Sequence, residues 1–200
     1  TGATSYDINN DNGIKALTLV KDLVDAGSMS KEVINWTQGD VMNQFISGNI
    51  AMMVNGPWQV PTMREQAPDL NWDVTLLPKD AEYASCLGGE NFGVIDGDNV
   101  DAALDFLQFA TSKDEVASYI DDFGYIAARK DVAEGQFTDD ETMQKFTEEM
   151  QYAQPRGPHA QWPEISDALS LAVNESITGT STPADAAAKA QSTIDGILAE

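Results

Sequence analysis

The stretch of sequence that decides the fold is Phe45-Ile46-Ser47-Gly48-Asn49-Ile50-Ala51-Met52-Met53-Val54-Asn55-Gly56-Pro57-Trp58. Gly48 is predicted to end a helix that begins after Thr37, because glycine commonly terminates helices. The apolar run at 50–54 is short and continuous, which is typical of a buried strand. Gly56-Pro57-Trp58 then turns the chain, and its proline suits the first position of another short helix. The stretch predicts helix, strand and turn in close succession.

Helices are predicted along most of the remaining chain. Apolar residues recur at helical spacing, and the sequences Ser112-Lys113-Asp114-Glu115 and Thr138-Asp139-Asp140-Glu141 are capping boxes that each open a helix. Helices are expected at 13–26, 100–110, 112–123, 138–153, 165–177 and from Thr182 onward.

Strands are fewer than helices. Besides the run at 50–54, strands are predicted at 72–77 and 92–95, from apolar residues bounded by proline and glycine. Three short strands make a thin sheet for so many helices. The pattern therefore suggests part of an α/β protein whose other strands lie outside this chain.

Charge narrows the classes of partner. The chain has 33 acidic and 11 basic residues, for a formal net charge of −22. Binding to nucleic-acid phosphates needs clustered Lys and Arg, so no nucleic-acid partner is expected. Anionic membrane surfaces are disfavoured for the same reason. No stretch approaches the ~18 apolar residues of a membrane span, so the chain is not expected to cross a membrane.

Few residues are suited to metal binding or catalysis. The single histidine, His159, and the single cysteine, Cys86, are far apart in sequence, so we predict no disulfide, metal site, nucleophilic dyad or cofactor. No nucleotide-binding or hydrolase motif is present. Glu90 and Glu164 are the best placed acids for a glycosidase pair, but acids are too abundant for such a pair to carry weight. No catalytic residue is assigned, and the chain is expected not to be an enzyme.

Two tryptophans stand out by their position. Trp58 and Trp162 lie in Gly- and Pro-rich turns beside helix starts, not on apolar helical faces. An indole placed there can offer a flat apolar surface to the C–H face of a pyranose ring. Glu90, Asn91 and Arg156 could bind the sugar hydroxyls. The residues alone leave a second interpretation open, in which both indoles fill gaps in the core.

The segment at 45–58 resembles the F-x-x-G-x-x-A-M-x-x-x-G-P-W segment of the maltose-binding-protein-like family of extracellular solute-binding proteins. The order of later features is also similar, and the resemblance covers nearly the whole chain. One departure is Ala127, where many relatives have proline. The matching features are Leu77-Pro78, Gly88-Gly89, the helix pair at 100–123, the segment at 124–129, residues 155–163, Gly179 and the segment at 182–186.

The resemblance implies an α/β, periplasmic-binding-protein-like (type II) fold, in which a hinge joins two lobes. This helix-rich chain with few strands would be only part of that fold. Residues 1–95 would form the first part of the C-terminal lobe and residues 154–200 its closing helices. Residues 96–153 would be a helical segment that belongs to the N-terminal lobe. Apolar residues of this segment are expected to lack their normal cover: Phe106, Phe109, Tyr119, Phe123, Phe146 and Met150.

The resemblance also implies a function, namely the substrate-binding component of an ABC importer. Such a protein traps a neutral sugar or oligosaccharide between its lobes and delivers it to the membrane permease subunits, without a cofactor. The location would be extracellular or periplasmic, with a lipid anchor at an N-terminus that lies outside this chain, which opens without a signal peptide. The implied ligand-binding residues are Trp58, Trp162, Gly89, Glu90, Asn91 and Arg156.

Three alternatives remain open at the level of sequence. The ligand could be a non-sugar solute such as glycerol phosphate or a polyamine, although the scarcity of basic residues disfavours a phosphorylated ligand. The chain could instead be a glycoside hydrolase or another carbohydrate-active domain. A helical interaction module without a small ligand is the third alternative.

Overall fold

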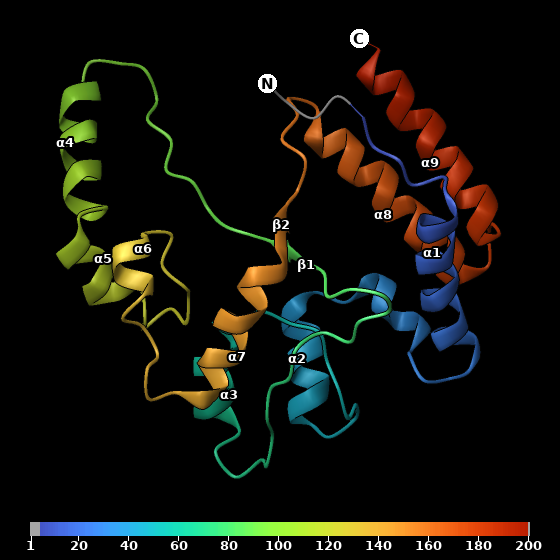
Figure 1. Cartoon of the computed structure of the whole chain (residues 1–200), viewed down its shortest axis with the longest axis horizontal. Helices are drawn as coiled ribbons and strands as arrows, with labels where there is room; N and C mark the ends of the chain where they lie inside the picture. The colour runs from blue at the N-terminus through green and yellow to red at the C-terminus, as the bar shows by residue number, and fades with distance from the viewer. Residues whose placement is uncertain (1–4, 200) are drawn as a thin grey trace. The chain divides into compact units, whose positions relative to one another are not determined.

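A computed structural model describes residues 5–199 of the chain (Figure 1). The chain divides into two compact units, and each is described by itself. The first unit combines Thr1–Thr37 with Gly157–Glu200, and the second is Gln38–Arg156. The division expected from the resemblance, with boundaries at residues 95 and 153, stays a prediction.

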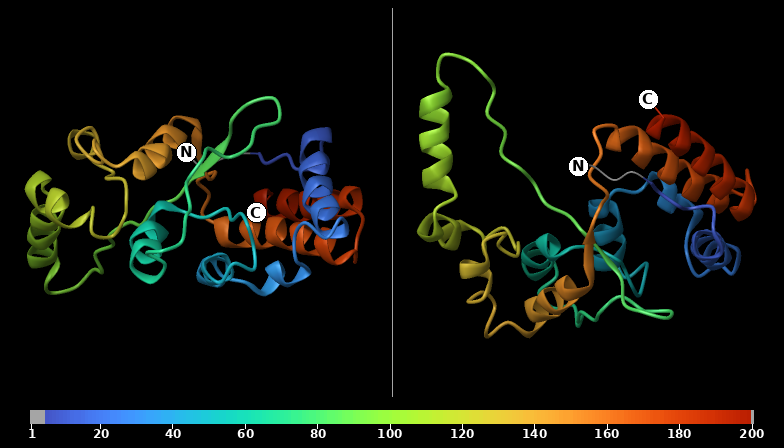
Figure 2. Two further views of the ribbon diagram at one scale, coloured as in Figure 1. Left: turned by 90° about the horizontal axis from the view of Figure 1, so that it is seen from below. Right: turned by 45° about the horizontal axis from the view of Figure 1, so that its top comes forward.

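The described part of the first unit is helical. Its elements are α1 (Asp11–Asp25), the 3-10 helix η1 (Lys31–Asn35), α8 (Trp162–Thr178) and α9 (Pro183–Leu198). The helices α8 and α9 run side by side, as both views of Figure 2 show, and α1 packs against the two of them.

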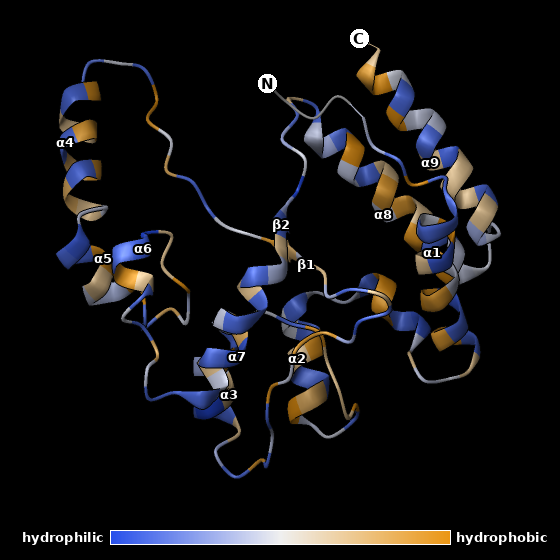
Figure 3. Ribbon diagram, in the orientation of Figure 1, coloured by the Kyte–Doolittle hydropathy of each residue, from blue (hydrophilic) through white to orange (hydrophobic). Residues whose placement is uncertain are grey.

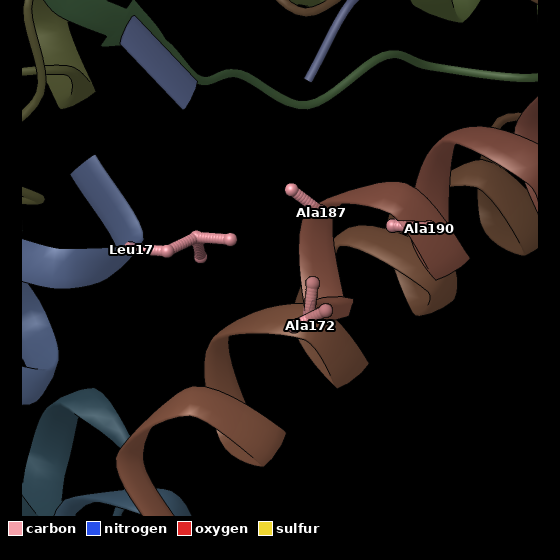
Figure 4. Close-up of a cluster of buried hydrophobic side chains, with 5 residues drawn as sticks. Leu17, Ala172, Ala187 and Ala190 are labelled. Carbon is pink, nitrogen blue, oxygen red and sulfur yellow. The ribbon is translucent and has the colours of Figure 1, made fainter. Parts of the chain in front are cut away.

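One core cluster of the first unit is built mostly from small residues. Leu17 of α1 points toward the alanines of α8 and α9 (Figure 4). Ala172, Ala187 and Ala190 are all buried, and Ala187 is 0% exposed. Because alanine has only a methyl side chain, the three helices can approach closely at these positions.

The second unit contains shorter elements. In the part of the chain that is described, the only paired strands are β1 and β2, which run parallel with the register Ser85↔Ala153, Cys86↔Gln154 and Leu87↔Pro155. The elements of this unit are α2 (Gln38–Ile46), η2 (Pro57–Gln59), α3 (Val60–Gln66), β1 (Ser85–Leu87), α4 (Val100–Ala110), α5 (Lys113–Tyr119), α6 (Lys130–Ala133), α7 (Glu141–Glu149), η3 (Met150–Tyr152) and β2 (Ala153–Pro155).

The three predicted strands are not formed. Residues 50–54, 72–77 and 92–95 are extended or irregular, and none pairs with another strand among residues 5–199. Met52 is 86% exposed and Ile95 is 92% exposed, so these runs are not buried. A strand needs a neighbour to pair its backbone N–H and C=O groups, and an apolar run cannot indicate whether that neighbour is present.

Several helix ends agree with the sequence. Gly27 and Gly48 follow α1 and α2 with φ of 72° and 71°, the left-handed conformation that glycine adopts at low cost. Pro57 opens a short 3-10 helix, as predicted. The oxygen Oγ1 of Thr182 accepts a hydrogen bond of 3.1 Å from the backbone N–H of Asp185 and caps α9.

Other predicted helix ends are wrong. Asn10 caps α1, so the helix starts before the predicted Gly13. Ser112 stands at the N-cap of α5 without a side-chain hydrogen bond, and this helix ends at Tyr119 instead of continuing to residue 123. The helix predicted for 138–153 begins after Asp140 and gives way to η3 and β2, because Asp140 rather than Thr138 provides the cap.

Asp140 has two structural roles. Its carboxylate caps α7 by accepting a hydrogen bond of 3.1 Å from the backbone N–H of Met143. Arg64 of α3 donates two further hydrogen bonds of 2.8 Å, one to each carboxylate oxygen. These bonds from Arg64 hold the pKa of the Asp140 carboxyl below its ordinary value. The pair therefore ties α3 to the start of α7.

Apolar side chains remain exposed on the segment from α4 to η3. Phe106, Phe109, Phe123 and Met150 are exposed, whereas Tyr119 and Phe146 are partly buried. Figure 3 shows apolar and polar residues alternating along α4, and no residue of this helix is buried. The described chain thus leaves Leu104, Phe106 and Phe109 of α4 exposed.

Substitution of Ala187 by leucine should destabilise the first unit. The added atoms have no space between α1, α8 and α9, so we expect a loss of about 1–3 kcal/mol in the free energy of unfolding. The matched control is Ala188→Leu, because Ala188 is the next residue of α9 and is exposed. Urea unfolding of both variants measures the difference, and equal stabilities would contradict close packing at Ala187.

Substitution of Asp140 should separate its two roles. Asp140→Asn keeps a cap acceptor and loses the ion pair. Because water screens the half-exposed Arg64, we expect this loss to lower the free energy of unfolding by only about 0.5–1 kcal/mol. Asp140→Ala loses both roles, at about 1–2 kcal/mol. Asp139→Asn is the control, since Asp139 is an exposed neighbour.

The loss in the free energy of unfolding caused by Asp140→Asn should also depend on pH. The pKa of Asp140 is lowered in the folded state, so its contribution is complete above the unfolded value of about 3.9 and is lost as the pH falls through the folded value. We expect urea unfolding to give the same difference in stability between Asp140→Asn and the unaltered protein at pH 7 and at pH 5. Below about pH 4 this difference should be smaller. A difference that does not change with pH would exclude the ion pair as its cause.

Candidate functional site

The parallel pair of strands brings four of the predicted site residues to one end. β1 ends at Leu87 opposite Pro155 of β2, so the chain leaves both strands at the same end. Gly89, Glu90 and Asn91 follow β1 after one intervening residue, and Arg156 follows β2 directly. All four are exposed. The register therefore places a carboxylate, an amide and a guanidinium in neighbouring segments, from which hydrogen bonds to hydroxyl groups can be made.

Trp58 lies in η2, folded back on the preceding turn. A Cβ atom at Gly56 would lie 2.1 Å from Cη2 of the indole, so only glycine leaves room for the ring. The centroid of the Tyr125 ring is 6.0 Å from that of Trp58, with 36° between the ring planes. Trp58 is partly buried. The indole is thus seated on a glycine and flanked by a second aromatic ring, and part of it remains accessible.

Trp162 is the first residue of α8 and has a similar environment in the first unit. Tyr6 is its aromatic neighbour, at 6.0 Å between centroids and 36° between planes. Its ring also packs against the buried cluster of Ile165, Ala168 and Ile194. Trp162 is partly buried. The indole therefore covers the core and still presents some surface.

The predicted site residues fall into separate groups. Gly89, Glu90, Asn91 and Arg156 share one end of the strand pair, and Trp58 belongs to the same unit. Trp162 belongs to the first unit.

Sequence reasoning missed the tyrosines that accompany these tryptophans. Tyr6 and Tyr125 are the ring partners of Trp162 and Trp58, and Tyr83 stacks on Tyr152 just before β1 and β2, with centroids 4.8 Å apart. Nζ of Lys79 lies 4.6 Å from the ring centroid of Tyr83, a cation–π contact. Tyr125 stands in the 124–129 segment that matches the family, which was the one available signal. No local pattern connects Tyr6 with Trp162.

Two surface hollows lie away from the predicted residues. One, of about 410 Å³, runs along α8 and α9 and is lined by residues such as Leu171, Ala172 and Ala190. The other, of about 270 Å³, lies between α3 and the start of α7 and is lined by Arg64, Asp140 and others.

Residues with potential for chemistry have ordinary structural surroundings. Cys86 is exposed and unpaired, and Nδ1 of His159 accepts a hydrogen bond of 3.1 Å from the backbone N–H of Gln161. Across residues 5–199, no group of three or more His, Cys, Asp or Glu residues is arranged to hold a metal ion. Within the same residues, no helix has the length and apolar character needed to span a bilayer.

Comparisons with known proteins show the family of the chain. Residues 2–145 match the family of bacterial extracellular solute-binding proteins. A candidate binding protein from Brucella abortus (strain 2308) is 28% identical over 185 residues, which are 88% of this chain and 45% of that protein. The chain therefore spans about half the length of the curated relatives that it matches.

Solved structures show the same fold. An ABC transporter solute-binding protein from Thermotoga lettingae, bound with α-D-tagatose, superposes with a TM-score of 0.81 at 27% identity. The match covers 96% of this chain and 50% of that one. A maltose-bound protein from T. maritima gives a TM-score of 0.80 at 21% identity, over 95% of this chain and 51% of that one. The expected fold class is thus confirmed, as a helix-rich part of a larger solute-binding fold.

The family match covers most of the chain, from residue 2 to residue 145. It confirms the resemblance noted in the sequence and the expectation of a binding protein rather than an enzyme. The chain belongs to the family of bacterial extracellular solute-binding proteins.

Proposed function

We propose that the full-length protein is the substrate-binding component of an ABC importer and binds a neutral sugar or oligosaccharide. One observation carries the proposal: each of the two predicted tryptophans is partly accessible and has a tyrosine ring at 6.0 Å. The C–H face of a pyranose packs on such aromatic surfaces, where each contact stabilises the complex by about 1–3 kcal/mol.

The exposed polar residues support a ligand with many hydroxyl groups. Glu90 accepts hydrogen bonds, Arg156 donates them and Asn91 does both. Gly89 gives the loop after β1 room for a ligand, since nothing lies within 4 Å of the position of its missing Cβ. We assign all four residues to the sugar site.

Charge and the ligands of the relatives both favour a neutral sugar. A phosphorylated solute is disfavoured by the net charge of −22 and by the scarcity of basic residues in these loops. The T. lettingae relative holds α-D-tagatose, a neutral monosaccharide. Relatives with the same fold include a cyclic maltosyl-maltose binding protein and a protein in complex with cycloalternan.

Uptake would follow from a change in conformation. Sugar that contacts both lobes favours the closed state by the difference between its affinities for the closed and open states. The permease subunits would then recognise the closed form. The family is extracellular, and we propose that a lipid anchor outside this chain holds the protein at the cell surface.

We also propose that residues 96–153 lie against a lobe outside this chain. The exposed Phe106 and Phe109 of α4 motivate the assignment, because soluble monomers rarely leave large apolar patches uncovered. The chain covers about half of its solved relatives, and a part equivalent to the rest of those relatives would provide the cover.

Replacing either tryptophan should weaken sugar binding by the full-length protein. We expect Trp58→Ala and Trp162→Ala each to cost about 1–3 kcal/mol of binding free energy, the scale of losing an aromatic contact. Calorimetry with D-tagatose, maltose, cycloalternan and a wider panel of neutral sugars provides the measurement.

Cys86→Ser is the matched control for this experiment. Cys86 lies in β1, close to the proposed site, and has no assigned role, so affinity should stay within about threefold of the unaltered protein. The assignment fails if both tryptophan variants bind as tightly as the unaltered protein. Turnover of an aryl glycoside would instead indicate a glycosidase, and binding of glycerol phosphate or a polyamine would indicate a different solute.

Phe109→Ser should destabilise the full-length protein although Phe109 is exposed in this chain. If the other lobe covers α4, the variant loses buried apolar area, and we expect a cost of about 1–3 kcal/mol in the free energy of unfolding. Gln108→Ala is the control, since Gln108 is an exposed polar neighbour on the same helix. Equal urea-unfolding midpoints for the two variants would argue against the proposed cover.

A further inference from the structure

Tyr6 is held in place through its hydroxyl group. Its Oη donates a hydrogen bond of 2.7 Å to the backbone carbonyl oxygen of Gly157. The ring lies so close to this glycine that a Cβ atom at position 157 would be 2.5 Å from Oη and 2.8 Å from ring carbons Cε1 and Cζ. Any other residue at 157 would have to displace the tyrosine. Tyr6 and Gly157 are therefore matched to each other across 151 positions of sequence.

The backbone of Tyr6 is fixed independently. Nε2 of Gln191, on α9, donates a hydrogen bond of 2.7 Å to the carbonyl oxygen of Tyr6. Oε1 of the same side chain accepts a bond of 2.9 Å from the backbone N–H of Ile8. The ring packs on the cluster that contains Ile165 and Ile194, both 0% exposed. Backbone, ring and hydroxyl of Tyr6 are thus held by separate parts of the first unit.

This fixed ring is the aromatic neighbour of Trp162. Gly157 and Trp162 lie at the two ends of one short loop, in which the backbone N–H of Trp162 donates a bond of 3.1 Å to the carbonyl oxygen of His159. Tyr6 contacts both ends of this loop, one through its hydroxyl and the other through its ring. Fixing the loop in this way fixes the orientation of the indole before a ligand arrives. A preorganised contact binds more tightly, because less conformational freedom is lost on binding.

We propose that Tyr6 and Gly157 are positioning residues for the sugar platform formed by Trp162. Tyr6 would orient the indole and would not itself contact the sugar. Gly157 is required because it leaves space for the tyrosine. This inference rests on the proposed function, since it gives Trp162 a ligand. It adds two residues that are far apart in sequence and that no motif connects.

Two substitutions in the full-length protein disturb the same contact from opposite sides. Tyr6→Phe removes the hydrogen bond and keeps the ring, and Gly157→Ala pushes the ring away. We expect each to weaken binding of the tightest-binding sugar of the panel by roughly three- to tenfold, the scale of one hydrogen bond. The matched control is Gly196→Ala in α9, where nothing lies within 4 Å of the added Cβ atom. Tyr83→Phe controls for the loss of a tyrosine hydroxyl elsewhere.

Double variants distinguish a positioning role from a general loss of structure. If Tyr6 acts through Trp162, then Tyr6→Phe should cause no further loss of affinity in a Trp162→Ala background. The double variant Tyr6→Phe, Gly157→Ala should lose less affinity than the two single losses combined, because both changes disrupt one contact. The tryptophan bands in the near-ultraviolet circular dichroism of the protein should change in Tyr6→Phe without ligand, and this change in the tryptophan bands should be absent in the Trp162→Ala background.

The outcomes separate this inference from the proposed function. If Trp162→Ala weakens binding but Tyr6→Phe and Gly157→Ala do not, the positioning role is wrong and the sugar site stands. If Tyr6→Phe has its full effect in the Trp162→Ala background, Tyr6 does not act through the indole, and the inference is again overturned. If Trp162→Ala leaves affinity unchanged, the assignment of Trp162 fails and the role of Tyr6 fails with it.

Discussion

The parallel pairing of β1 with β2 is the constraint on which the arrangement of the second unit depends. Only three residues of each strand are paired, yet they join segments that are 68 positions apart. The register decides that residues 88–91 and Arg156 leave the strands at one end. It also places Tyr83 against Tyr152 just before the strands begin, where the stacked rings support the pair. A slip of one residue would turn every side chain of the slipped strand to the opposite face.

In both units a glycine leaves the space that an aromatic ring occupies. Gly56 leaves room for the Trp58 indole and Gly157 for the Tyr6 ring, and at both positions a Cβ atom would overlap the neighbouring ring. Neither role requires a positive φ, so each glycine is needed for space rather than for conformation. Aromatic rings held in this way lose little conformational entropy on binding, because they have few rotatable bonds and these are already restricted. Such seating suits the proposed function, in which rigid rings hold a ligand with many conformers.

The sequence predicts the helices better than the strands, for a physical reason. A helix satisfies its own backbone hydrogen bonds, so its apolar period and its end residues are visible locally, as the match of the predicted 100–110 to α4 illustrates. A strand depends on a partner elsewhere, and residues 50–54 lack one among the described residues. The candidate site divides in the same way. Trp58 and Trp162 were found from local turns, whereas Tyr6 was missed because its contacts to Gly157 and Gln191 span most of the chain.

A second lobe, as proposed from the length of the relatives, would account for both the exposed apolar residues and the incomplete sugar site. In a two-lobe binding protein, the affinity for sugar is the sum of contacts from both lobes minus the cost of closing them. The residues assigned to the sugar site can account for aromatic contacts and for one set of hydrogen-bonding groups. If the other lobe provided no contacts, the sugar would bind the open and closed states equally and could not shift the balance between them. Under the proposed function, a second lobe would therefore have to contact the sugar in the closed state, and under the proposed placement of residues 96–153 it would also cover exposed apolar side chains of α4.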